Sequence, residues 1–132
     1  MSAGNKTIAR AWFDQVMNGR DISAIDQLYS HDYTYRGPEG RVARGLEQAK
    51  EMAQMLIEAM PDRMSIVEDQ IAEGDKVVTR WVSRGTPSGP LLGRPADGRR
   101  IAVHGITISR ISDGKIVEDW EILRMVEETD SV

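Results

Sequence analysis

Acidic residues gather near the carboxyl end of the chain, where Glu118, Asp119 and Glu121 lie close together. They follow residues 101–110, in which apolar and polar side chains alternate, and the intervening Ser112-Asp113-Gly114 is typical of a β-hairpin turn. A carboxylate that points from such a hairpin into a poorly hydrated space has a raised pKa, as a general acid or base working near neutral pH needs. Acids of this kind are equally typical of a solvated sheet face, so the pattern alone leaves both interpretations open.

The geometry of the turn decides which polar residues share a face. If Gly114 completes a three-residue loop in the left-handed conformation, one face groups four polar residues: Thr107, Ser109, Asp119 and Glu121. A two-residue turn would shift the pairing by one position and bring Glu118 beside Ser109 instead. The side chains on this part of the first strand are small and would leave space above the sheet, so we expect one of its faces to line a cavity.

Other side chains are candidates for assisting the chemistry or contacting a ligand. His104, on the same predicted strand as Thr107, is either a proton carrier or a half-buried polar residue. Five large aromatic residues either face a planar ligand or belong to the core: Trp12, Tyr33, Tyr35, Trp81 and Trp120. The chain has no cysteine, two histidines (His31 and His104) and no glycine-rich phosphate motif, so we expect neither a metal site nor a cofactor.

Helical periodicity dominates the first half of the sequence. Residues 5–17 and 45–60 repeat apolar side chains at three- and four-residue steps, and each segment predicts an amphipathic helix. We expect Ser23 to be the N-cap of a short helix between them, followed by a less regular segment at 29–35.

From residue 64 the apolar pattern changes to a period of two. It predicts strands over residues 64–71, 76–85, 101–111 and 115–123, with a proline- and glycine-rich loop at 86–98. Helices followed by a meander of strands, without alternation of the two, indicate an α+β fold in which the helices pack on one face of an antiparallel sheet.

Length and composition narrow the classes of function. A chain of 132 residues fits one domain, which we place at 1–132. The net charge of -4 argues against nucleic-acid binding, and we expect the one basic cluster, Arg94, Arg99 and Arg100, to be a solvated loop. Residues 1–10 lack the apolar run of a signal peptide, and no run is long enough for a membrane span, so we expect a cytoplasmic protein that does not contact membranes.

Short motifs distributed over most of the chain form a recognisable set: NK (5–6), NGRD (18–21), PDRM (61–64), EDQIAEGDKV (68–77), GT (85–86), GRPADGR (93–99) and ISRISDGKIVEDW (108–120). This set resembles the SnoaL-like polyketide cyclases. The resemblance implies the cystatin-like cone fold shared with nuclear transport factor, scytalone dehydratase and ketosteroid isomerase relatives. In that fold, amino-terminal helices pack on a strongly curved antiparallel sheet around an internal pocket. The resemblance also implies a homodimer or tetramer assembled through the sheet, and a reaction without metal or cofactor.

The same resemblance assigns roles to two positions. In the best-known members an aspartate on the final strand is the acid/base, and a histidine on the preceding strand assists it. Aligned through DGKI (113–116), the aspartate position falls on Glu121 and the histidine position on Thr107. The sequence therefore keeps an acid at the first position and has no proton acceptor at the second.

Three functions agree with these features. The first is a cofactor-independent acid/base enzyme, of cyclase, isomerase or dehydratase type, that acts on a small, largely apolar carbonyl compound. In it Glu121 is the base, Tyr33, Tyr35 or His104 stabilises the enolate oxygen, and Glu118 is a further candidate acid. The second is a non-catalytic binding module for a small apolar or aromatic metabolite, favoured by Thr107 at the histidine position. The third is a structural oligomer whose cavity is filled by side chains.

Overall fold

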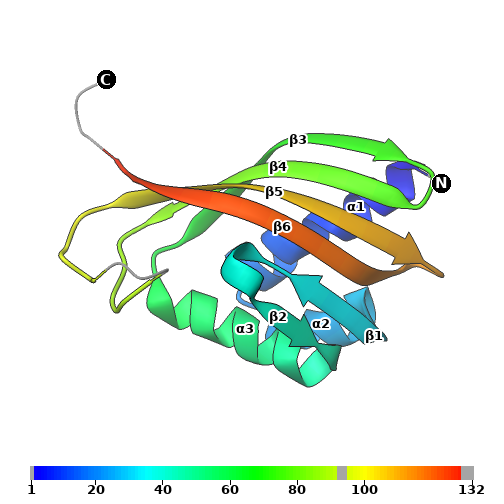
Figure 1. Ribbon diagram of the computed structural model, residues 1–132, viewed down its shortest axis with the longest axis horizontal. Coiled ribbons are helices and arrows are strands. Elements are labelled where there is room, and N and C mark those ends of the chain that lie inside the picture. Colours follow the sequence, from blue (N-terminus) through cyan, green and yellow to red (C-terminus); the bar gives the residue numbers. More distant parts are fainter. Residues whose placement is uncertain (1, 92–94, 129–132) are drawn as a thin grey trace.

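The computed structural model describes residues 2–91 and 95–128, which form a curved sheet with helices on one side (Figure 1). The helical segments are α1 (Ser2–Ala11), the π-helical η1 (Trp12–Asn18), the 3₁₀ turns η2 (Ile22–Ala24) and η3 (Pro38–Gly40), α2 (Ile25–Leu28) and α3 (Gly45–Ala59). The strands are β1 (Tyr29–Arg36), β2 (Val42–Arg44), β3 (Met64–Glu73), β4 (Lys76–Gly85), β5 (Ile101–Ser112) and β6 (Lys115–Glu127). They form one open sheet in the order β2-β1-β6-β5-β4-β3.

The first predicted helix forms but changes type along its length. α1 continues directly into η1, whose wider i→i+5 turns are uncommon and often accompany functional sites. Asn18 fixes the end of η1 to β3, because its side chain donates to the Ser65 carbonyl oxygen (2.7 Å) and accepts from the Ser65 N–H (2.8 Å). The prediction of Ser23 as an N-cap is wrong. Ser23 lies inside η2, and Asp21 takes the N-cap position.

The predicted strands after residue 64 pair as the antiparallel meander β3-β4-β5-β6, and β6 extends beyond its predicted end. The segment expected to be less regular is strand β1, which runs parallel to β6 with Tyr35 opposite Asp119. The sheet is therefore antiparallel except for this one pairing. Polar residues 30–32 interrupt the apolar alternation of β1, so local pattern does not reveal it. It is recognised as a strand from its pairing between β2 and β6.

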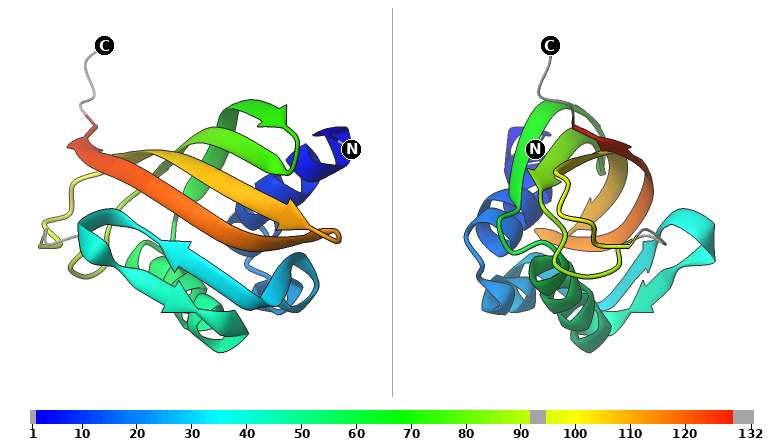
Figure 2. Two further views of the ribbon diagram at one scale, coloured as in Figure 1. Left: turned by 45° about the vertical axis from the view of Figure 1, so that its right-hand side comes forward. Right: turned by 90° about the vertical axis from the view of Figure 1, so that its left-hand side faces the viewer.

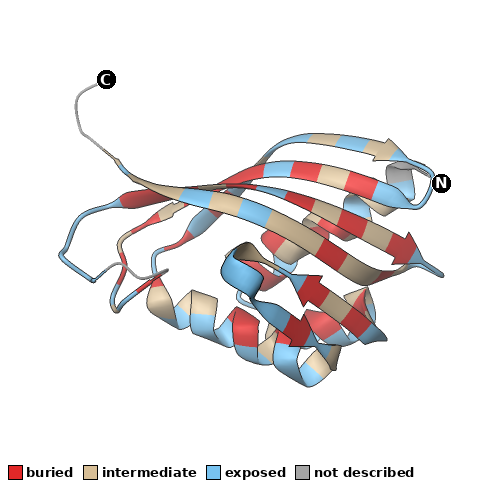
Figure 3. Ribbon diagram, viewed as in Figure 1, coloured by how far each residue is buried: buried red, intermediate tan, exposed pale blue. Residues whose placement is uncertain are grey.

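The core lies between the concave face of the sheet and the helices. The sheet curls around α1, η1 and α3 (Figure 2), and buried residues alternate with more exposed ones along β4 and β5 (Figure 3). This alternation is expected when only one face of an antiparallel sheet is covered. One apolar cluster surrounds Ile25 and Tyr29, and a second surrounds Phe13 and Trp81.

The basic cluster lies on the loop between β4 and β5. Arg99 forms an ion pair with Glu127 (3.0 Å), and Arg100 forms one with Glu128 (3.2 Å), so acids at the end of β6 neutralise both. Arg94 lies outside the described residues. Within residues 2–91 and 95–128, none of the helices has the length and apolar character to cross a membrane.

Candidate active site

The turn of the β5–β6 hairpin is the shorter of the two that the sequence allows. It has two residues, Asp113 and Gly114, with φ of 52° and 75°. Positive φ at both central positions is what a type I′ hairpin turn requires. By itself, this turn would bring Glu118 beside Ser109.

A β-bulge reverses that outcome within a few residues. Ile111 pairs with Ile116, whereas Arg110 pairs with Glu118, so Val117 is an extra residue on β6. Beyond the bulge, odd-numbered residues of β5 face odd-numbered residues of β6. The bulge therefore produces the grouping that a three-residue loop would have produced.

Asp119 is a buried acid on the concave face of β6. Its carboxylate accepts hydrogen bonds from Ser109 Oγ on β5 (2.5 Å) and from the Tyr33 hydroxyl on β1 (2.7 Å). Tyr33 is itself held by an edge-to-face contact with Tyr29, with ring centroids 4.6 Å apart. Neighbouring strands on both sides thus fix the orientation of this carboxylate.

Glu121 lies two residues further along the same face and is held in the same way. It accepts from Thr107 Oγ1 (2.6 Å) and from the Tyr35 hydroxyl (2.7 Å). Trp81 Nε1 donates to Thr107 Oγ1 (2.9 Å), which directs the threonine hydrogen toward the carboxylate. The indole ring has room because Gly105 lies beneath it: a Cβ there would be 2.2 Å from the ring.

A hollow bounded by helices and sheet contains both carboxylates. Its apolar wall includes residues from η1, α3, β4 and β5: Trp12, Phe13, Met17, Met52, Leu56, Trp81 and Val103. About 70 Å³ is open to the centres of water-sized molecules, several times the roughly 10–15 Å³ that one water needs. Side chains therefore do not fill it, unlike the cavity of the structural-oligomer hypothesis.

Burial changes the acidity of both carboxyl groups. It raises the pKa of Asp119 to about 7, although the two hydroxyl donors lower it, and the charge of Glu121 raises it further. Burial also raises the pKa of Glu121, against the lowering effects of its own two donors and of Arg63. The charge of Glu121 acts on Asp119, whereas the cation Arg63 favours the ionised form of Glu121.

The two tyrosines that bind the acids remain neutral hydrogen-bond donors. Burial raises the pKa of both Tyr33 and Tyr35, and the adjacent carboxylates raise each pKa further. Neither phenol therefore loses its proton near neutral pH.

Most of the predicted site residues lie together. The hollow is lined by Trp12, Tyr33, Tyr35, Trp81, Thr107 and Glu121. Their convergence follows from strand alternation on β1, β4, β5 and β6, with η1 supplying Trp12 from the opposite side.

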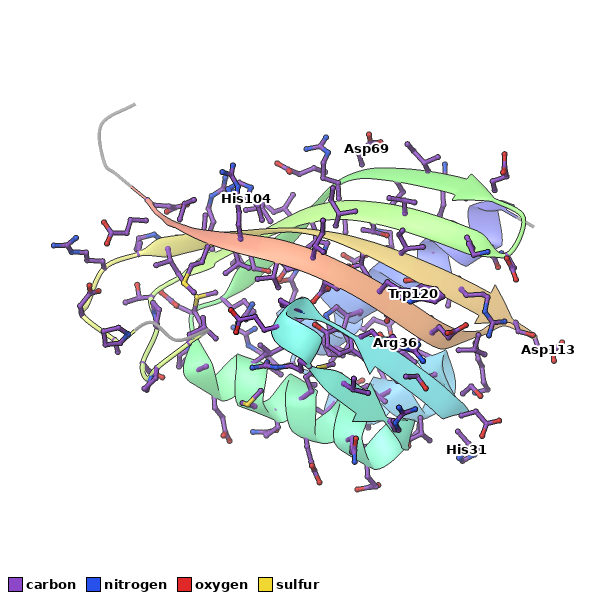
Figure 4. The ribbon with its side chains drawn as sticks, viewed as in Figure 1. His31, Arg36, Asp69, His104, Asp113 and Trp120 are labelled. Atoms are coloured by element: carbon purple, nitrogen blue, oxygen red, sulfur yellow. The ribbon has the colours of Figure 1, made fainter. Side chains whose placement is uncertain are left out.

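Three predicted site residues do not lie there: His104, Glu118 and Trp120. They occupy even-numbered positions, which point to the convex face of the hairpin, so the expectation that they join Glu121 is corrected. Figure 4 shows His104 above the sheet, on the side away from α3. Glu118 instead accepts from Arg110 Nε (2.7 Å) and Arg36 Nη1 (3.2 Å), in contact with solvent.

Three charged residues that the structure describes in the hollow are not among the predicted site residues: Asp119, Arg63 and the exposed Arg41. Asp119 has a usable signal, since it stands two residues from Glu121 on the same strand and must share its face. Arg63 has none, because a cation just after the end of α3 looks like a solvated loop residue. In the structure it is 4% exposed and lines the hollow.

The described part of the chain does not contain an evident set of metal ligands. Residues 2–91 and 95–128 contain no group of three or more His, Asp or Glu side chains placed to hold a metal ion.

Comparison with known proteins gives no match among curated protein sequences but several among solved structures. TsrD from Streptomyces laurentii is 30% identical, with a TM-score of 0.79 over 92% of this chain and 88% of TsrD. IdmH from Streptomyces antibioticus, assigned as a polyketide cyclase, is 28% identical, with a TM-score of 0.77 over 90% of this chain and 91% of IdmH. A protein from Jannaschia sp. CCS1, assigned as a SnoaL-like polyketide cyclase, shares the fold at 24% identity, with a TM-score of 0.83 over 92% of this chain and 86% of that chain.

The similarity extends along nearly the whole sequence. The sequence model of the SnoaL-like polyketide cyclases matches residues 7–127, which include every strand of the sheet and both carboxylates of the hollow. The chain belongs to the SnoaL-like polyketide cyclase family.

Proposed function

We propose that this chain is an enzyme that uses acid/base catalysis, without metal or cofactor, to cyclise or isomerise a small, largely apolar carbonyl compound. The observation that carries the proposal is the pair Glu121 and Asp119, held by hydroxyl groups in an apolar hollow where burial raises the pKa of both. Two acids whose environments separate their acidities are the usual basis of an acid/base pair. The assignment of IdmH as a polyketide cyclase supports the same class of reaction.

Glu121 is the base in this proposal. In its ionised form, which the nearby Arg63 favours, it removes a proton from a C–H group next to the substrate carbonyl, and the electrons of that bond move onto the carbonyl oxygen. The resulting enolate needs hydrogen-bond donors. Tyr35, whose hydroxyl donates to Glu121 in the free protein (2.7 Å), turns toward the enolate oxygen when substrate binds.

Asp119 is the acid. With a pKa of about 7 it keeps its proton over part of the neutral range, and its side chain is the less exposed of the two acids. In the cyclisation, the enolate carbon attacks a second carbonyl group of the substrate, a C–C bond forms, and Asp119 gives its proton to the resulting alkoxide. Glu121 then passes the proton taken from carbon to Asp119, directly or through a water molecule in the hollow. The two carboxyl groups therefore restore each other in every cycle.

The test is a comparison of two substitutions on one strand, Glu121→Gln and Glu118→Gln. Enolisation is measured as deuterium uptake from D2O into 2-tetralone and related apolar ketones, followed by NMR. Loss of the base should slow uptake by roughly 10²- to 10⁴-fold, whereas the outward-facing Glu118→Gln should change it less than about twofold. Equal uptake by Glu121→Gln and the unaltered protein, with both folded by circular dichroism, would rule out Glu121 as the base.

A second candidate is a non-catalytic module that binds an apolar or aromatic metabolite. Thr107 favours it, since threonine cannot accept a proton near neutral pH at the position where the best-known members carry histidine. Such a module would keep a ligand through purification, detected by native mass spectrometry, and would not accelerate deuterium uptake by any ketone tested.

A further inference from the structure

Arg63 is a buried cation whose backbone is firmly held. It lies in the connection between α3 and β3, where its N–H donates to the Met60 carbonyl oxygen (3.0 Å). Arg20 Nη2 donates to the carbonyl oxygens of Pro61 (2.7 Å) and Arg63 (3.0 Å). The side chain, 4% exposed, extends from this fixed position to the wall of the hollow.

The guanidinium group has far more donors than acceptors around it. Arginine carries five N–H donors, and among the described residues the side chain of Arg63 makes one hydrogen bond, from Nη2 to the Leu56 carbonyl oxygen (3.2 Å). Nε is buried without a partner, and Glu121 acts on the guanidinium through its charge while its own hydrogen bonds come from Thr107 and Tyr35. A buried N–H group without a hydrogen bond lowers the stability of a protein. The free donors of Arg63 therefore point to an acceptor that arrives with a ligand.

The rest of the hollow restricts what that acceptor is. Glu121 and Asp119 repel an anion placed beside them, and the remaining wall is mainly aromatic and aliphatic. In the described part of the chain, two arginines line the hollow: Arg41, which is exposed, and Arg63, which is buried. An anionic group inside the hollow is accommodated at the buried guanidinium of Arg63, with the apolar part of the molecule between it and the carboxylates. A planar carboxylate matches the paired N–H groups of arginine.

We infer that Arg63 binds a carboxylate of the substrate, so that the substrate is an apolar oxo acid whose acidic C–H group faces Glu121. This inference rests on the proposed function for the orientation of the substrate. The anchoring of a carboxylate by Arg63 is independent of whether the reaction occurs.

The experiment compares acids with their amides. The ligands are benzoate, phenylacetate and 3-phenylpropionate, together with the carboxamide of each acid. Isothermal titration calorimetry measures their binding to the unaltered protein, to Arg63→Met and to Arg63→Lys. We expect at least one acid to bind the unaltered protein tenfold or more tightly than its amide. Arg63→Met should lose roughly 10- to 100-fold in affinity for that acid and little for the amide, and Arg63→Lys should recover part of the loss.

A purely structural role predicts a different result. If Arg63 serves only to bind the carbonyl group of Leu56 near the end of α3, Arg63→Met should lower the melting temperature without changing the preference for acid over amide. If no acid binds more tightly than its amide, or if Arg63→Met keeps the preference, the inference is overturned. The same titrations on Glu121→Gln separate the two proposals, because that variant should keep the acid preference even if the base assignment fails.

Discussion

Glu118 and Glu121 are the same residue type on the same strand, yet the two faces of the β5–β6 hairpin give them different environments. Glu118 is outside, where it binds two arginines whose side chains are 35% and 44% exposed. Glu121 is inside, where hydroxyl groups bind it and burial raises its pKa. On the outer face water and arginine stabilise the charge. On the inner face the missing water makes the carboxyl group a proton acceptor.

The site depends on which acids occupy the odd-numbered, inward-facing positions of the hairpin, and not on the presence of acids as such. Both faces carry acidic residues, but only the inner face has neutral donors in place of salt bridges. Hydroxyl groups orient a carboxylate while leaving much of its basicity, whereas a paired arginine would remove it.

Replacing Asp119, the second acid of the inner face, should change how the free energy of unfolding depends on pH. The pKa of Asp119 is raised from 3.8 to about 7 in the folded state, so the folded protein binds more protons than the unfolded chain between these values. The contribution of this group to stability is therefore largest below pH 4 and is lost as pH rises toward about 7, by up to about 4 kcal/mol. In urea unfolding, Asp119→Asn should gain stability relative to the unaltered protein between pH 4 and pH 8.

The outer acid provides the matched control for this measurement. Glu118→Gln should change the free energy of unfolding by less than about 1 kcal/mol at both pH values, as expected for solvent-exposed ion pairs. If the stability gain of Asp119→Asn does not grow with pH, the inner carboxyl group is not dehydrated and the contrast between the two faces fails.

Activity should report the two inner acids separately. Because Glu121 must be ionised and Asp119 protonated, kcat/KM should rise with pH and then fall as Asp119 loses its proton near pH 7. Asp119→Asn should lower the maximum by about 10- to 100-fold and remove the falling limb, measured as deuterium uptake across pH 5 to 9. A falling limb that persists in this variant would assign it to another group.

The smallest effect is expected from Thr107, which binds the base. Its hydrogen bond lowers the pKa of Glu121, so Thr107→Val should raise that pKa and move the rising limb to higher pH. We expect turnover on that limb to fall by roughly 2- to 10-fold, the value of one hydrogen bond.

The control for this change is Thr79→Val, which removes a buried hydroxyl of β4 that accepts from Gln70 (3.2 Å) and does not line the hollow. It should leave the position of the limb unchanged. An equal displacement in both variants would show that Thr107 acts through the sheet and not through Glu121.

Much of the fold could be predicted because local patterns determine it. The helical period over residues 5–17 and 45–60 and the period of two after residue 64 reflect which side of each element is covered, and α1 with η1, α3 and the meander follow them. β1 escaped because its apolar alternation is interrupted, and the energy that makes it a strand comes from pairing with β6, far away in the sequence.

Residue type and short-range spacing were enough to establish the two long amphipathic helical segments, the four strands of the meander, the family and the closely spaced acids on one hairpin. Which of these acids face the hollow depends on tertiary structure. The bulge at Val117 turned Asp119 and Glu121 inward, and β1 brought in tyrosine hydroxyls from 86 residues earlier. Burial then left Nε of Arg63 without a hydrogen-bond partner, because dehydration depends on everything packed around a group and not on its neighbours in the chain.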